Sequence, residues 1–140
     1  MNQTVEKRLD GASVGDWIRN NTNLLLMFAL IIVGALMARF PPKKINALYG
    51  YRTERSMKSA DTWVFANVYS GKLIWRTGWV ALAAAALVSL LFRRFGEGAM
   101  TIVNLLLMAA QCVALIVIIP MTEQALKATF DDEGVRKQQP

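Results

Sequence analysis

The stretch from residue 41 to residue 78, PPKKINALYGYRTERSMKSADTWVFANVYSGKLIWRTG, decides the fold because it separates two long apolar runs. Pro41 and Pro42 end any helix that precedes them, since proline lacks the backbone N–H and disfavours helical geometry in the residue before it. Ser59 is a predicted N-cap for a helix that begins at Ala60, with Asp61 facing the positive end of the helix dipole. The stretch therefore predicts a capped turn between two helices.

The helix that follows this turn carries a stripe of Trp, Asn and Gly residues on one face. Trp63, Asn67 and Gly71 recur at helical spacing, and Asn67 needs a hydrogen-bond partner if the stripe is buried. Residues 60–92 could form one helix, but at 1.5 Å per residue it would be about 50 Å long, which exceeds a single membrane crossing. We therefore expect the first half to be an amphipathic helix that lies along the membrane surface or projects from it.

Apolar runs on both sides of this stretch indicate a membrane protein. The chain is 54% hydrophobic, and residues 24–38, 77–92 and 99–119 are uncharged apolar segments of the kind that span a bilayer. The sequence predicts an all-α membrane protein with three transmembrane helices and an amphipathic interfacial helix between the first and second. We divide it into a polar N-terminal segment (1–22), a three-helix membrane domain (23–128) and a charged C-terminal tail (129–140), which we expect to be frayed.

The second and third spans contain residues suited to helix packing. In the second span, small residues recur at every fourth position: Thr77, Ala81, Ala85 and Ser89. This ridge predicts contact with another helix of the same chain or of a second copy. In the third span, Asn104 and Gln111 share a face, and polar groups in hydrocarbon need partners. They are candidates for an interhelical hydrogen bond or for a polar ligand groove.

The net charge of +6 favours anionic lipid headgroups over nucleic acid as a partner, because the basic residues flank the apolar runs. Of the 16 Lys and Arg residues, five lie on the side of the N-terminus and second loop, and eleven lie on the other side. The positive-inside rule then predicts an outside N-terminus, with the C-terminus and residues 41–78 in the cytoplasm.

The chain has little equipment for catalysis or metal binding. It contains no His and one Cys, Cys112, which lies in the third apolar run and which we expect to be a buried, inert thiol. We find no paired carboxylates and no activated nucleophile. The sequence predicts a protein that is not an enzyme and that needs no metal or cofactor.

The stretch 41–78 also resembles a known family. The pattern is Asn46-x-x-Tyr49-Gly50-Tyr51-Arg52-Thr53, then Ser56 and Lys58, then Trp63-x-x-Ala66-Asn67-x-x-x-Gly71. It is similar to the motif of the SdpI family of small bacterial membrane proteins. The resemblance implies a protein of the bacterial inner membrane. The best-understood members act as immunity proteins against a secreted peptide toxin and hold a transcriptional repressor at the membrane. The namesake type is longer and has additional spans.

The resemblance implies a signature that binds a ligand or holds the structure together: Asn46, Tyr49, Gly50, Arg52, Thr53, Trp63 and Asn67. Three functions remain open. The protein is an immunity factor that binds a membrane-active peptide toxin or protects its target, a small transporter subunit, or a scaffold that binds anionic lipids. The spans contain no Asp or Glu for an ion-coupled relay. Expected partners are membrane lipids, a peptide toxin and a second copy of the chain.

Overall fold

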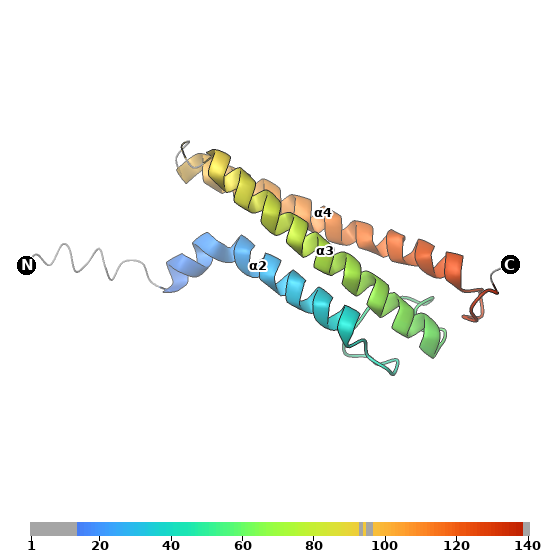
Figure 1. The fold of residues 1–140 in the computed structure, drawn as a ribbon. Coiled ribbons are helices and arrows are strands. Elements are labelled where there is room, and N and C mark those ends of the chain that lie inside the picture. The colour runs from blue at the N-terminus through green and yellow to red at the C-terminus, as the bar shows by residue number, and fades with distance from the viewer. Residues whose placement is uncertain (1–13, 93, 95–96, 139–140) are drawn as a thin grey trace, which may run out of the picture.

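The computed structural model describes residues 14–92, 94 and 97–138 of the 140-residue chain. This part of the chain folds into the helices α2 (Val14–Arg39), α3 (Ala60–Phe92) and α4 (Glu97–Thr129). All three are long and apolar enough to cross a membrane, and α3 lies between α2 and α4 (Figure 1). The predicted all-α membrane architecture with three spanning helices is confirmed.

The helices are longer than the apolar surface that they present. The helices α3 and α4 each have 33 residues, or about 50 Å, against a hydrocarbon core of about 30 Å. On the helices, exposed large apolar side chains lie between Leu24 and Leu36 of α2, Trp75 and Leu91 of α3, and Ile102 and Met121 of α4. We call this surface the apolar band. The first half of α3 and the last turns of α4 extend beyond one end of the band, beside the loop 40–59 (Figure 1).

The amphipathic interfacial helix expected between the first and second spans is not confirmed as an element of its own in the described residues. The helix α3 runs without a break from Ala60 to Phe92, and no helix lies between Arg39 and Ala60. Trp63 and Asn67, on the stripe noted in the sequence, are fully buried within the protein. Because other parts of the chain cover this stripe, the first half of α3 projects as part of the bundle and needs no membrane surface to cover it.

The helices α2 and α3 approach each other at glycines. A Cβ atom added to Gly34 would lie 2.4 Å from the backbone nitrogen of Trp75, and one added to Gly71 would lie 2.7 Å from the backbone nitrogen of Ala38. A Cβ on Gly78 would meet Ile31 in the same way. Real side chains do not fit at these distances, so the two backbones are in direct contact.

The ends of the described chain have regular structure. The helix α2 begins at Val14, and its stretch that is apolar enough to cross a membrane begins at Thr22, one residue before the expected start of the membrane domain at residue 23. The expectation of a frayed tail is wrong for residues up to 138. Phe130 is 1% exposed and forms a β-bridge with Arg136, and the Lys137 N–H donates to the Thr129 carbonyl over 3.0 Å.

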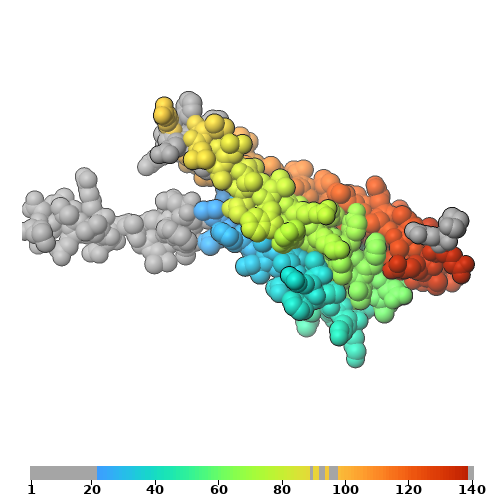
Figure 2. Space-filling model, in the orientation of Figure 1, coloured from blue at the N-terminus to red at the C-terminus, as the bar shows by residue number. Residues whose placement is uncertain are grey.

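The tail turns back because its own residues favour the turn. The carboxylate of Asp131 accepts hydrogen bonds from the N–H groups of Glu133 and Val135, at 3.0 and 2.8 Å. Gly134 takes a φ of +82°, which few other residues adopt. The space-filling view shows the tail packed against the end of the bundle near the start of α3 (Figure 2).

Candidate functional site

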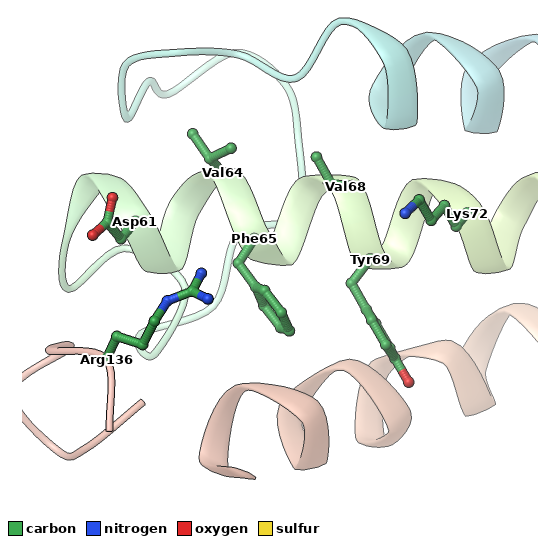
Figure 3. Close-up of a pocket in the computed structure, with 7 residues that line it drawn as sticks. All are labelled: Asp61, Val64, Phe65, Val68, Tyr69, Lys72 and Arg136. Carbon is green, nitrogen blue, oxygen red and sulfur yellow. The ribbon is translucent and has the colours of Figure 1, made fainter. Parts of the chain in front are cut away.

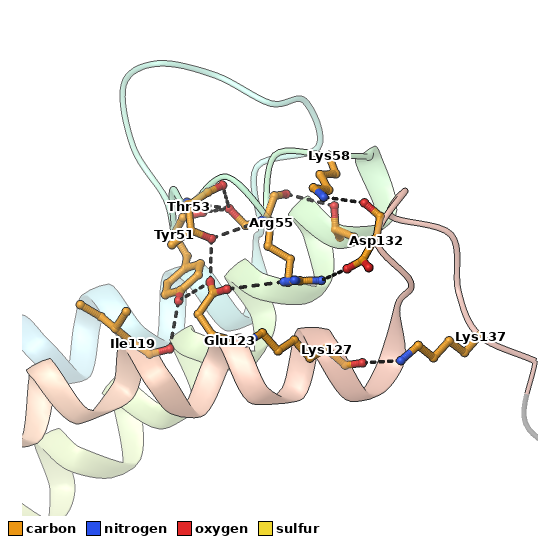
Figure 4. Close-up of polar contacts among 11 residues, drawn as sticks. Tyr51, Thr53, Arg55, Lys58, Ile119, Glu123, Lys127, Asp132 and Lys137 are labelled. Carbon is orange, nitrogen blue, oxygen red and sulfur yellow. Dashed lines mark hydrogen bonds and ion pairs between the residues drawn. The ribbon is translucent and has the colours of Figure 1, made fainter.

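The candidate site is a group of polar side chains where the loop 40–59 meets α4 (Figure 4). At its centre is the carboxylate of Glu123. Its Oε1 accepts hydrogen bonds from the Thr53 hydroxyl over 2.7 Å and from the Tyr51 hydroxyl over 3.0 Å. The Nε of Arg55 lies 3.9 Å from Glu123 Oε2. We call these four residues the Glu123 cluster, and it fastens the loop to α4.

The Tyr51 hydroxyl remains protonated in this position. Burial is the main cause that raises the pKa of Tyr51 well above its usual value, and the hydrogen bond and charge of Glu123 add to it. The hydroxyl oxygen also lies 3.1 Å from the carbonyl oxygen of Ile119. Its single proton therefore has two acceptors on α4, and both favour the neutral phenol.

Arg55 connects the cluster to the tail. Its Nη1 lies 3.2 Å from Asp132 Oδ1, and Lys58 Nζ donates to the Asp132 carbonyl. The Asp132 side chain is 91% exposed, so this end of the connection is open to solvent. Beside it is a pocket of about 340 Å³, lined by Thr53, Glu54, Arg55, Lys58, Glu123 and Lys127. The pocket presents charged groups of both signs.

Asn67 holds the loop against the projecting half of α3. Its Oδ1 accepts a hydrogen bond from the Tyr51 N–H over 2.7 Å, and its Nδ2 donates to the Trp63 carbonyl over 2.8 Å. The indole Nε1 of Trp63 donates to the Pro42 carbonyl over 2.7 Å. Asn67 and Trp63 are both 0% exposed. These two signature residues therefore fix the loop from within, and neither presents a surface to a ligand.

Gly50 is required at this contact for two reasons. Its φ of +112° is one that residues with a side chain rarely adopt. A Cβ atom at this position would also lie 2.5 Å from Asn67 Oδ1, the atom that accepts the Tyr51 N–H. Glycine therefore permits both the turn and the hydrogen bond.

The remaining signature residues in the loop lie nearer to solvent. The Asn46 side chain accepts hydrogen bonds from the N–H groups of Leu48 and Tyr49, both at 3.0 Å. Exposed Arg52 donates to the Ala47 carbonyl over 2.9 Å, and the Tyr49 residue is 57% exposed. Asn46 and Arg52 shape the turn, and Tyr49 and Arg52 are the signature side chains on its surface.

One reciprocal pair of hydrogen bonds lies within the loop, between Thr53 and Ser56, and a second joins Ser59 to Thr62 at the start of α3. The Thr53 N–H donates to the Ser56 hydroxyl over 2.9 Å, and the Ser56 N–H donates to the Thr53 hydroxyl over 3.2 Å. Ser59 caps α3 as predicted, because its hydroxyl accepts the Thr62 N–H over 3.1 Å. The same hydroxyl lies 2.8 Å from the Gly134 carbonyl oxygen, so the cap also holds the tail.

The residues expected to pack helices lie elsewhere, within the apolar band. Ala85 is 9% exposed, Thr77 and Ala81 are half-buried, and the side chain of Ser89 lies outside the described part of the structure. The backbone carbonyl of Asn104 accepts a hydrogen bond from Asn23 Nδ2 over 3.1 Å. Gln111 is 7% exposed, and its Nε2 has no partner among the described residues.

Three residues that join the loop to the rest of the fold were not predicted from the sequence: Glu123, Arg55 and Asp132. One signal could have identified Glu123, because it is the only acidic residue between Glu97 and Asp131. A carboxylate just after a span, in a chain with a basic loop, needs a cation or several donors. No comparable signal distinguishes Arg55 from the other basic residues of the loop.

The arrangement brings hydrogen-bond donors and charges of both signs together where the loop meets α4. The chain has no His, and the described residues contain no group of three His, Cys, Asp or Glu that could hold a metal ion. The Thr53 hydroxyl donates to the Glu123 carboxylate, whose other oxygen lies 3.9 Å from Arg55 Nε. The site offers fixed donors and charges to a ligand.

Comparison with known proteins identifies the family. A model of the SdpI/YfhL protein family matches residues 43–122, a region that includes most of the loop and all of α3. An uncharacterized protein named YfhL from Bacillus subtilis (strain 168) is 39% identical over 106 residues, which are 75% of this chain and 86% of that protein. No solved structure matches. The family model and this relative together show that the chain belongs to the SdpI/YfhL family.

Proposed function

We propose that this protein is a non-enzymatic immunity protein of a bacterial cytoplasmic membrane. It protects the membrane against a membrane-active peptide toxin, either by binding the toxin or by protecting its target. Family membership supports this proposal. The observation that carries it is the Glu123 cluster, which holds a preformed charged pocket of about 340 Å³ just beyond the apolar band.

The position of the pocket suits a ligand that arrives through the bilayer. Glu123 follows Met121, the last exposed apolar residue of α4 in the band, by two positions. A peptide in the headgroup layer could therefore reach the pocket without leaving the membrane surface. The positive-inside count favours a cytoplasmic location for the loop and tail, with the N-terminus outside.

The proposal assigns two kinds of role to the signature. Buried Trp63 and Asn67, together with Gly50, hold the loop in shape, whereas Tyr49 and Arg52 are on its surface. Contact with a toxin would then fall to the exposed residues and to the pocket. Substitutions of the first kind should reduce both protein level and protection, while those of the second kind should reduce protection alone.

The test is survival of a toxin-sensitive bacterium that expresses the chain, challenged with a panel of membrane-active peptides. We expect wild-type protein to raise survival, and Glu123→Gln to lose protection while the protein still accumulates in the membrane. Gln keeps an acceptor for Tyr51 and Thr53 but removes the charge. Arg94→Glu, at the opposite end of the bundle, is the control. Unchanged survival with wild-type protein across the panel would remove the main support for immunity.

Exposed basic residues favour a second candidate function, an anionic-lipid-binding scaffold. The side chains of Arg39, Lys43, Lys44, Lys72 and Arg76 are exposed, and they lie near the end of the apolar band where headgroups would be. Such positions attract anionic lipids, each by about 1 kcal/mol. Native mass spectrometry that retains an anionic lipid in the wild type and loses it in Arg52→Ala would favour this candidate.

A further inference from the structure

A second groove, separate from the Glu123 cluster, runs along the projecting half of α3 (Figure 3). Its volume is about 390 Å³, and it shares no lining residue with the first pocket. Four apolar or aromatic side chains form its walls: Val64, Phe65, Val68 and Tyr69. A volume of this size is typical of sites that enclose a small ligand or a few side chains of a partner.

The aromatic wall of this groove is already assembled. The rings of Phe65 and Tyr69 are stacked, with centroids 5.8 Å apart and planes 14° apart. Phe65 also meets the ring of Phe130 edge-on at 5.4 Å, and Phe130 is buried. Because Phe130 packs against Phe65, the aromatic side chains are already ordered, and a ligand that binds them would not pay the entropic cost of ordering them.

The groove lies outside the apolar band. Its residues on α3 run from Asp61 to Lys72, whereas the exposed apolar side chains of α3 begin at Trp75. From Trp75 to Leu91 the helix already rises about 25 Å, close to the thickness of the hydrocarbon core. Lipid acyl chains would therefore not reach the apolar walls, which leaves them open to a partner from the aqueous side.

The charges at the two ends of the groove differ. Asp61 and Arg136, which carry opposite charges, lie at one end of the groove, and Lys72 lies at the other end (Figure 3). The guanidinium of Arg136 also lies 5.4 Å above the ring of Phe130. The Lys72 end is therefore positive, and the other end is nearly neutral overall.

We propose that this groove binds an extended peptide segment of about five residues, with apolar side chains in its middle and an acidic group at the Lys72 end. Asp61 and Lys72 lie about 16 Å apart along the helix, a span that about five extended residues cover at 3.3 Å each. The proposal concerns a different surface from the immunity proposal, and neither depends on the other.

Repulsion between like charges argues against a second copy of the chain as the partner that binds in the groove. Two copies in one membrane would be related by a two-fold axis along the bilayer normal, which places the same stretch of each α3 face to face. Lys72 would then lie against Lys72 of the other copy, and like charges in contact are unfavourable. A partner that carries an acidic group does not meet this repulsion.

The proposal can be tested with full-length protein in nanodiscs of uncharged phosphatidylcholine. Two fluorescein-labelled pentapeptides serve as probes, Leu-Ala-Leu-Ala-Glu and Leu-Ala-Leu-Ala-Lys, and fluorescence anisotropy reports their binding. We expect the acidic peptide to bind about tenfold more tightly, a difference of about 1.4 kcal/mol. Lys72→Glu should reverse this preference. Arg94→Glu has the same change of charge at the far end of the bundle and should preserve it.

Val68→Asn tests the apolar wall and should weaken binding of both peptides. Circular dichroism of each variant in nanodiscs establishes that the helices are intact. Equal binding of the two peptides to the wild type would overturn the proposal, as would an equal effect of Lys72→Glu and Arg94→Glu. Phosphatidylglycerol vesicles that bind in a Lys72-dependent manner, with peptide binding independent of Lys72, would make this a lipid site and also overturn it.

Discussion

The two ends of the same bundle are held together by different physical means. Within the apolar band, α2 and α3 meet at glycines, and few side chains are buried. Beyond the band, Asn67, Trp63 and Glu123 hold the loop against α3 and α4 through hydrogen bonds, and Leu126 and Phe130 form a small hydrophobic core with Ala66. Inside the bilayer close backbone approach replaces the hydrophobic effect, whereas outside it the chain packs as a soluble domain does.

The largest expected effect on stability comes from Gly34→Ala, within the band. The new Cβ would lie 2.4 Å from a backbone nitrogen of α3, so the two helices must separate. We expect the free energy of unfolding to fall by about 3 kcal/mol, as for severe overpacking. Thermal unfolding in detergent measures it. Gly98→Ala is the matched control, since a Cβ there meets nothing within 4 Å. An equal effect of both changes would argue against the close approach.

The next test is Asn67→Ala, outside the band. The change removes the acceptor of the Tyr51 N–H and the donor to the Trp63 carbonyl, both in a buried place. We expect a loss of about 2 to 3 kcal/mol, because unpaired buried groups are costly. Asn46→Ala provides the comparison, since its hydrogen bonds lie in an exposed turn and are each worth about 0.5 to 1 kcal/mol. If the two variants lose equal stability, burial of Asn67 is not what matters.

Ser59→Ala tests the cap that also contacts the tail. Loss of the N-cap should cost about 1 kcal/mol of stability. The tail should loosen as well, because the Ser59 hydroxyl contacts the Gly134 carbonyl. Limited proteolysis of the tail, measured beside thermal unfolding, separates the two effects. Faster cleavage in Ser59→Ala is expected, and an unchanged rate would show that Arg55 and Lys58 suffice to hold the tail.

The smallest effect concerns alkaline pH and Tyr51. Its pKa is raised in the folded protein, so the stability that it contributes is complete below the unfolded pKa of about 10. As pH rises from there through the folded pKa, this contribution is lost. Tyr51→Phe, which has no proton to lose, should show a shallower decline in unfolding temperature above pH 10. Parallel declines in both proteins would contradict the role of the phenol.

Features that depend on residue patterns within one element were predicted from the sequence, whereas contacts between distant elements were not. The three spans follow from apolar runs, and the cap at Ser59 follows from residue type and position. Helical spacing places Trp63 and Asn67 on one face of α3, and the structure buries both. Each of these features depends on residues that are near one another in the chain.

The parts that were missed require contacts across the chain. The tail looked frayed because its composition is polar, yet Phe130 and Gly134 dock on residues more than sixty positions earlier. Glu123 looked like an ordinary residue after a span, because its partners Tyr51 and Thr53 lie in the loop. For the first half of α3, the sequence left a position along the membrane surface and a projection from it both open, because nothing local shows that loop and tail cover it.

Amide hydrogen exchange in the wild-type protein tests the central claim, that loop and tail form one folded module, most directly. The N–H groups of Tyr51 and Thr53 in the loop, and of Asp131 and Lys137 in the tail, all have hydrogen-bond partners. We expect each to exchange at least about 100-fold more slowly than in an unstructured chain. Glu123→Ala should reduce protection in both segments. Exchange of these four amides at unprotected rates in the wild type would contradict the account.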